Sequence, residues 1–128
     1  MIVLDASALI AHLDGDDSFH EAAEELLLAR AEDHFAASTT SIAEVLVGPA
    51  RAGRLAEAER ALRRLEVEEV GLGEGAAVRL AGLRASTGLR LPDCCTLLAA
   101  ESRAGEVATF DRRLASAARM LGLAVEGA

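Results

Sequence analysis

Short apolar runs typical of β-strands alternate with longer helical segments along the chain, and this alternation constrains the fold more than any other feature. Strands separated by helices form βα units, in which right-handed crossovers place helices on both faces of a parallel sheet. The runs predict strands at residues 2–4, 34–37, 67–70, 107–110 and 123–125, and helices at residues 7–13, 20–31, 40–50, 55–65, 74–87, 92–103 and 112–121. We therefore predict an α/β fold, a three-layer α/β/α sandwich with a mostly parallel sheet of about four to five strands.

The composition fits one globular domain and excludes several kinds of chemistry. The 128 residues are 52% hydrophobic, which suits a single domain over residues 1–128. Thirteen basic and 21 acidic residues give a net charge of −8, and a field of this sign does not attract nucleic acid or an anionic membrane. Every basic residue is arginine, so the chain has no lysine for a P-loop or a Schiff base.

The start of the chain and the cysteines predict a cytoplasmic protein. No basic residue precedes the first apolar run, and no stretch approaches the roughly 20 apolar residues of a membrane span, so we expect neither a signal peptide nor a transmembrane helix. Cys94 and Cys95 are adjacent, and neighbouring side chains on a helix point about 100° apart, which makes them a poor metal-binding pair. We expect two small buried side chains in a reducing compartment.

Four acidic residues are predicted to meet at one edge of the sheet. Asp5 and Asp111 each directly follow a predicted strand, and Asp93 and Glu44 lie in the first turns of two helices. If those two strands are neighbours, all four carboxylates lie beyond the carboxyl ends of the strands, where ligands bind in such folds. Burial of unpaired carboxylates raises their pKa and lowers the stability of the fold. A hard divalent cation bound among them removes the repulsion between their negative charges. Mg²⁺ or Mn²⁺ suits such an oxygen-only set of ligands.

Each acid also has a purely structural interpretation. Asp5 and Asp111 are suited to be N-caps of the helices that follow them, and Asp93 is suited to the positive end of a helix. Ser41 and Glu44 match the pattern of a capping box. Under this interpretation the protein is a non-enzymatic module whose apolar surface docks a partner helix. A phosphoaspartyl hydrolase is a further alternative, but Ser7 stands where such enzymes need a second aspartate, and the lysine that they use is missing.

Four segments of the chain together resemble a known family. The sequence resembles the PIN-domain ribonucleases, and in the order, spacing and length of the motifs it is similar to the VapC-type toxins of bacterial toxin–antitoxin pairs. The resemblance covers essentially the whole chain. The matching segments are residues 3–11, residues 41–46, residues 91–94 with 98–100, and residues 109–114.

The resemblance implies an endoribonuclease that depends on Mg²⁺ or Mn²⁺ and cleaves RNA with a metal-activated water. Asp5, Asp93 and Asp111 match metal-ligand positions, and Glu44 matches an acid that acts through a water or a second metal. Members of the family usually form homodimers and are inhibited by a cognate antitoxin. The polar positions that orient the acids and waters are matched by Ser7 and Thr109, and Leu114 stands where the family often has an aromatic residue.

RNA binding by so acidic a chain requires a local group of arginines. Arg90, Arg112 and Arg113 flank the acidic motifs and are the best candidates for contacts with the RNA backbone. The only aromatic residues are three phenylalanines. We therefore expect no aromatic platform on which bases stack, and limited recognition of the RNA sequence by stacking.

Overall fold

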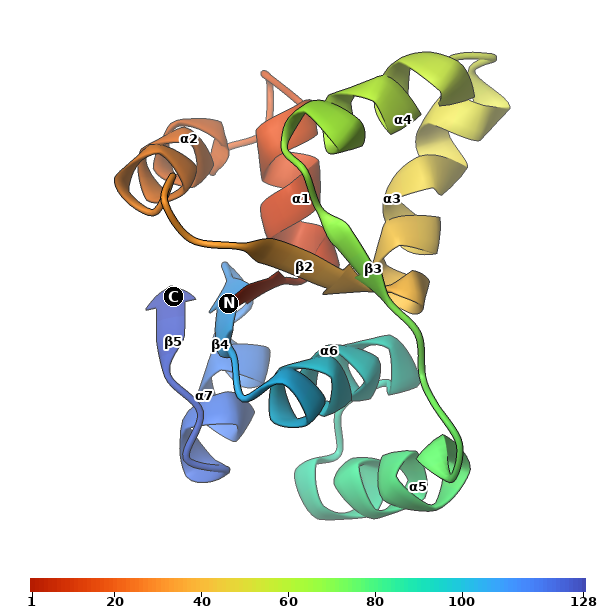
Figure 1. Cartoon of the computed structure of the whole chain (residues 1–128), viewed down its shortest axis with the longest axis vertical. Coiled ribbons are helices and arrows are strands. Elements are labelled where there is room, and N and C mark those ends of the chain that lie inside the picture. Colours follow the sequence, from red (N-terminus) through yellow and green to blue (C-terminus); the bar gives the residue numbers. More distant parts are fainter.

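The computed structural model describes all residues 1–128 and contains a five-stranded sheet in which every pair of neighbouring strands is parallel (Figure 1). The strands lie in the order β3-β2-β1-β4-β5. They are β1 (Ile2–Leu4), β2 (Phe35–Ser38), β3 (Glu68–Val70), β4 (Glu106–Thr109) and β5 (Val125–Gly127). The helices are α1 (Ala6–Leu13), α2 (His20–Ala29), α3 (Thr39–Arg51), α4 (Leu55–Arg64), α5 (Ala76–Thr87), α6 (Leu91–Arg103) and α7 (Arg112–Met120). The predicted α/β fold is confirmed.

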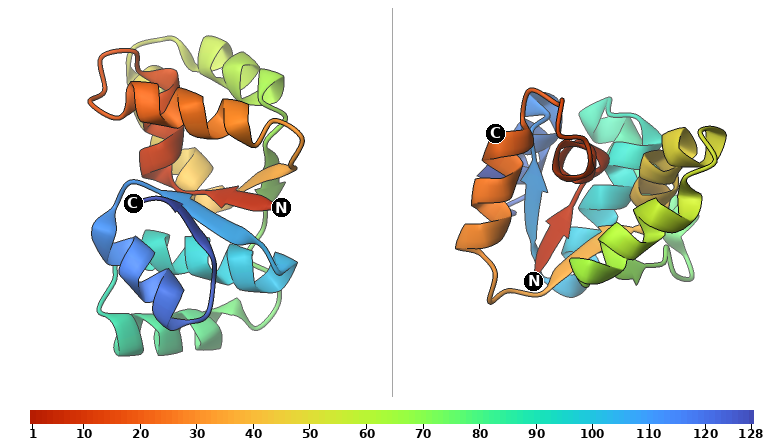
Figure 2. Two further views of the ribbon diagram at one scale, coloured as in Figure 1. Left: turned by 90° about the vertical axis from the view of Figure 1, so that its left-hand side faces the viewer. Right: turned by 90° about the horizontal axis from the view of Figure 1, so that it is seen from above.

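Helices cover both faces of the sheet, as the predicted three-layer arrangement requires. Figure 1 and the left view of Figure 2 show α1 to α4 on one side of the sheet and α5 to α7 on the other. Successive residues of a strand point to opposite faces, and β1 is buried on both. Ile2 and Leu4 contribute to one hydrophobic cluster, while Val3 contributes to the other.

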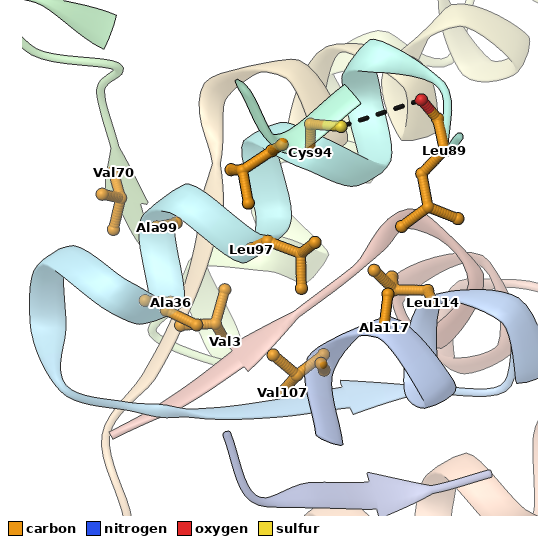
Figure 3. Close-up of a cluster of buried hydrophobic side chains, with 13 residues drawn as sticks. Val3, Ala36, Val70, Leu89, Cys94, Leu97, Ala99, Val107, Leu114 and Ala117 are labelled. Carbon is orange, nitrogen blue, oxygen red and sulfur yellow. Dashed lines mark hydrogen bonds between the residues drawn. The ribbon is translucent and has the colours of Figure 1, made fainter. Parts of the chain in front are cut away.

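The second cluster fills the space between the sheet and α5 to α7 (Figure 3). Val3 and Val107 from the strands face Leu97 of α6 and Leu114 of α7, and all four side chains are fully buried. Burying a leucine side chain contributes about 1.5–3 kcal/mol, so these contacts hold α6 and α7 firmly on the sheet. Cys94 belongs to the same cluster, and its thiol is free. The expected role as a small buried side chain is confirmed.

The order of the strands creates a switch point between β1 and β4. The chain runs outward from β1 through β2 to β3, and then returns to place β4 on the other side of β1. Leu4 of β1 pairs with Ala108 of β4, so these two strands are neighbours, as the predicted convergence of the acids required. In parallel α/β sheets, ligands bind beyond the carboxyl ends of the strands at such a point. We call this side of the sheet the carboxyl edge; it lies at the left in the left view of Figure 2, where α1 and α7 begin.

Several element boundaries differ from the prediction by one or two residues. β4 ends at Thr109, so Asp111 is separated from the strand by Phe110 instead of following it directly. The helix expected from residue 74 begins at Ala76, because Gly75 adopts a left-handed conformation with φ of 76° that an α-helix cannot include. No helix has the combination of length and apolar character needed to span a membrane.

Candidate active site

Asp5 is the most buried acid at the carboxyl edge, with 4% of its surface exposed. It immediately follows β1 and caps α1, because its Oδ1 accepts a hydrogen bond of 2.9 Å from the backbone N–H of Ala8. The Ser7 hydroxyl donates to Oδ1 at 2.7 Å, and the Thr109 hydroxyl donates to Oδ2 at 2.5 Å. The carboxylate is therefore held by the first turn of α1 and by the last residue of β4.

Burial raises the pKa of Asp5 above its ordinary value, although three hydrogen bonds oppose the shift. The Thr109 hydroxyl, the Ala8 N–H and the Ser7 hydroxyl each lower the pKa, and the negative charge of Asp93 raises it again. The three hydrogen bonds therefore do not fully offset the cost of burying the negative charge of this carboxylate. A cation at the carboxyl edge would supply the missing compensation.

Ser7 and Thr109 form a small network of hydroxyls between the two strand ends. The two oxygens lie 3.3 Å apart, and Thr109 is fully buried. The backbone N–H of Phe110 donates to Ser7 Oγ at 3.0 Å, and the N–H of Asp111 donates to Thr109 Oγ1 at 3.0 Å. The two hydroxyls therefore fix the turn after β4 as well as the carboxylate of Asp5.

Asp93 lies in the first turn of α6, after a proline that suits the start of a helix. Its side chain is 19% exposed, and its only ion-pair partner is Arg90, whose Nε lies 3.9 Å from Oδ2. Burial raises the pKa of Asp93, and the charges of Asp111 and Glu44 raise it further, while Arg90 and Arg113 lower it. The other three predicted acids are thus each within electrostatic reach of Asp93.

Asp111 has a structural role as well as its place in this group. It is exposed and caps α7, with Oδ1 accepting from the N–H groups of Arg113 at 2.8 Å and Leu114 at 3.2 Å. The capping interpretation is therefore confirmed for Asp111, as it is for Asp5. A cap at this position does not compete with metal binding, because a carboxylate has further lone pairs to share.

The capping interpretation is wrong for Glu44. The N-cap of α3 is Ser38, whose hydroxyl accepts from the N–H of Ser41 at 3.1 Å, so the helix begins before the expected capping box. Glu44 lies in the second turn, is half-buried, and forms no hydrogen bond or ion pair. An acid in this position contributes nothing to the end of its helix and is free for another role.

The four acids converge at the carboxyl edge, but they do not form a closed metal site. No three acidic, histidine or cysteine side chains lie close enough together to hold one ion. The chemistry of the group nevertheless fits a hard divalent cation, since it offers carboxylate oxygens and the charges of its members raise the pKa of Asp5 and Asp93. Binding would require the more exposed side chains to turn toward Asp5.

The PIN domain family model matches residues 2–120 of the chain. The protein belongs to the PIN-domain family. No curated protein sequence matches it. Among solved structures, a toxin–antitoxin complex from Klebsiella pneumoniae is 23% identical, with a TM-score of 0.77 and 91% of each chain covered.

Two further similar structures show that this PIN protein shares the fold over nearly its whole length. VapC20 of Mycobacterium tuberculosis, described as a toxin that cleaves the sarcin–ricin loop, is 15% identical with a TM-score of 0.68, and the match covers 91% of this chain and 95% of that one. VapBC2 of Rickettsia felis, bound to a DNA fragment from its promoter, is 15% identical with a TM-score of 0.71 over 100% and 99% of the two chains.

The three candidate arginines lie at the same edge of the sheet as the acids of this PIN domain. Arg90 precedes α6, and Arg112 and Arg113 begin α7, so all three lie at helix ends on the carboxyl edge. All are exposed. Two of them, Arg90 and Arg113, lower the pKa of Asp93, which places positive charge beside the acidic group.

Sequence reasoning missed an aromatic pair beside these acids. Phe19 and Phe110 stack with their ring centroids 4.9 Å apart and their planes 7° from parallel. We expected no aromatic platform because the chain has only three phenylalanines. That expectation is wrong for Phe19 and Phe110, whose rings the fold stacks together. No local pattern could have revealed the pair, because the two residues belong to loops far apart in the chain that only the fold brings together.

Proposed function

We propose that this PIN domain is a metal-dependent endoribonuclease and the toxin of a type II toxin–antitoxin pair, with residues 1–128 acting as one unit. The observation that carries the proposal is the convergence of Asp5, Glu44, Asp93 and Asp111 at the switch point between β1 and β4. One of these acids has no structural role in its own helix, and two have a raised pKa. Perturbed groups gathered at a ligand-binding edge are typical of functional sites.

Asp5, Asp93 and Asp111 are the proposed ligands of Mg²⁺ or Mn²⁺, and Glu44 is the proposed ligand through a water. A divalent ion there would lower the pKa of a bound water and balance the charge of the phosphodiester and its leaving oxygen. The chain's own contribution is rigidity, because Ser7 and Thr109 hold the Asp5 carboxylate in a single orientation. In-line attack of water on phosphorus would leave a 5′-phosphate and a 3′-hydroxyl.

The RNA backbone would lie against Arg90, Arg112 and Arg113. The net charge of −8 makes this local positive charge necessary, since the protein as a whole repels a polyanion. The three guanidinium groups are exposed and suited to phosphate oxygens. Binding of RNA should therefore weaken steeply as salt rises.

The proposed partners are a cognate antitoxin and a second copy of the chain, and the proposed location is the cytoplasm. The similar structures support the antitoxin, because one is a toxin–antitoxin complex and another contains the VapBC2 pair. The competing interpretation, a non-enzymatic docking module, is supported by the caps that Asp5 and Asp111 form. It does not account for Glu44, which caps nothing.

The test is cleavage of labelled single-stranded RNA in Mn²⁺ by the parent, Asp5→Asn and Asp93→Asn. Removing a metal ligand should lower the rate by roughly 100-fold or more, because even residues that only support a metal ligand cost about 10–100-fold. Circular dichroism checks that each variant is folded. Asp14→Asn is the matched control and should cut at the parental rate, because Asp14 follows the far end of α1 and its side chain accepts only from the backbone N–H of Asp16. Unchanged cleavage in either site variant would overturn the proposal.

A further inference from the structure

A hollow of about 470 Å³ opens next to the acidic group and is lined in part by aromatic side chains. Three of its seven lining residues are apolar, namely Phe19, Phe110 and Ile10. Ser7 and Asp111 line it as well, and both belong to the proposed active site. The hollow is therefore continuous with the carboxyl edge.

We propose that this hollow binds an unpaired base of the RNA, from a nucleotide adjacent to the phosphate that is cleaved. The inference rests on the proposed nuclease function and deepens it by assigning a substrate-binding residue, Phe19. Single-stranded RNA is recognised mainly by bases that turn outward and stack on aromatic side chains. The stacked rings offer that surface within reach of the acids.

The aromatic pair is held as a rigid unit. Phe110 is half-buried, and its backbone N–H donates to Ser7 Oγ at 3.0 Å. Phe19 stacks on it and is 47% exposed, so a large part of its ring faces water. A ring already fixed by a neighbour loses little entropy when a base stacks on it. An exposed phenylalanine that is both rigid and beside the acids therefore favours a ligand-binding role over packing alone.

The polar groups around the hollow favour a base over a phosphate. Asp17 and Asp111 carry negative charge that repels a phosphate, while Arg112 lies on the side that continues into α7. Asp17 Oδ1 accepts from the N–H of Phe19 at 2.8 Å, and Oδ2 forms no hydrogen bond. This second oxygen can accept from an amino or ring N–H group, which bases carry and phosphates lack.

The experiment measures kcat/KM for cleavage of a mixed-sequence single-stranded RNA by the parent and three variants of Phe19. Phe19→Ala should lower kcat/KM by roughly 5-fold or more, mostly through KM, since stacking contributes about 1–3 kcal/mol per base. Phe19→Leu keeps an apolar side chain without a ring and should fall equally, whereas Phe19→Trp should retain the parental value. Leu28→Ala is the control, because this side chain is 80% exposed on α2 and does not line the hollow.

A second measurement locates the base. Abasic sites placed in turn at each position around the cut should lower the parental kcat/KM at one position, and should have no effect there in Phe19→Ala. Full activity of both Phe19→Ala and Phe19→Leu, with an unchanged cleavage pattern, would overturn the base-binding role while leaving the nuclease intact. Loss of binding to a protein partner with undiminished RNA cleavage would also overturn it. Failure of the parent to cleave any RNA would instead overturn the nuclease proposal.

Discussion

The two ends of the parallel strands carry the same kinds of acidic residue but opposite electrostatic arrangements. Where β3 and β4 begin, Glu68 pairs with Arg103, and Glu106 lies 2.7 Å from Arg30 Nη1. Arg30 also binds Asp33 at 2.7 Å and Glu126 at 2.9 Å, and the hydrogen bonds to Glu106 and Asp33 raise the pKa of its guanidinium. We call this side the amino edge.

At the carboxyl edge, no arginine approaches an acid as closely. The shortest such distance is the 3.9 Å between Arg90 and Asp93, and Glu44 has no charged partner. Burial raises the pKa of both Asp5 and Asp93, because each loses hydration without gaining a close cation. The comparison teaches that the chain pairs the acids of one edge closely with arginines, while the acids of the other edge have no arginine as near.

The largest expected effect that tests this contrast is stabilisation by metal. Mn²⁺ at a hundred times its dissociation constant should raise the free energy of unfolding of the parent by about 2.7 kcal/mol, because only the folded state gathers the ligands. Asp5→Asn should lose the increase. Glu106→Gln, an amino-edge control, should keep it. Urea unfolding with and without Mn²⁺ measures both, and equal loss in the two variants would break the distinction between the edges.

Removal of the arginine that joins the amino edge should have the next largest effect. Arg30→Met leaves Asp33, Glu106 and Glu126 without their shared partner and should lower the free energy of unfolding measurably, by more than the loss of an unpaired surface arginine. The same urea titration applies. Arg60→Met, at an exposed position without an ion pair, should stay within about 0.5 kcal/mol of the parent. Equal effects would show that the pairing is unimportant.

The smallest expected effect is the pH dependence of the free energy of unfolding that Asp5 causes when no metal is present. Because the pKa of Asp5 is raised above its ordinary 3.8, the stability that this group contributes is complete below that pH and is lost as pH rises through the folded-state pKa. Unfolding of the parent and Asp5→Asn in a chelator measures the difference. The parent should lose stability relative to the variant as pH rises, by no more than about 1.4 kcal/mol per pH unit. A difference that does not change with pH would contradict the electrostatic account of this edge.

Much of the site could be read from the chain because βα units have a fixed polarity. Placing Asp5 after one strand and Asp93 at the start of a helix requires only that the segments be recognised, since helix starts and strand ends share an edge. The resemblance of four ordered motifs then pointed to the same acids. The start of α3 could not be predicted from the sequence, because Ser38 is both the last residue of β2 and the N-cap of α3.

Local patterns along the chain were thus sufficient for the layers, the parallel sheet and the acids at its carboxyl edge, since these follow from hydrophobic period and chain direction over short distances. The pairing of Leu4 with Ala108, the stacking of Phe19 on Phe110 and the joining of three acids by Arg30 required the folded molecule. Each of these contacts unites segments distant in sequence, and their positions depend on the order of the strands and the packing of whole helices. The alternation of apolar and polar residues along the chain does not specify these long-range contacts. They form only when the hydrophobic core packs.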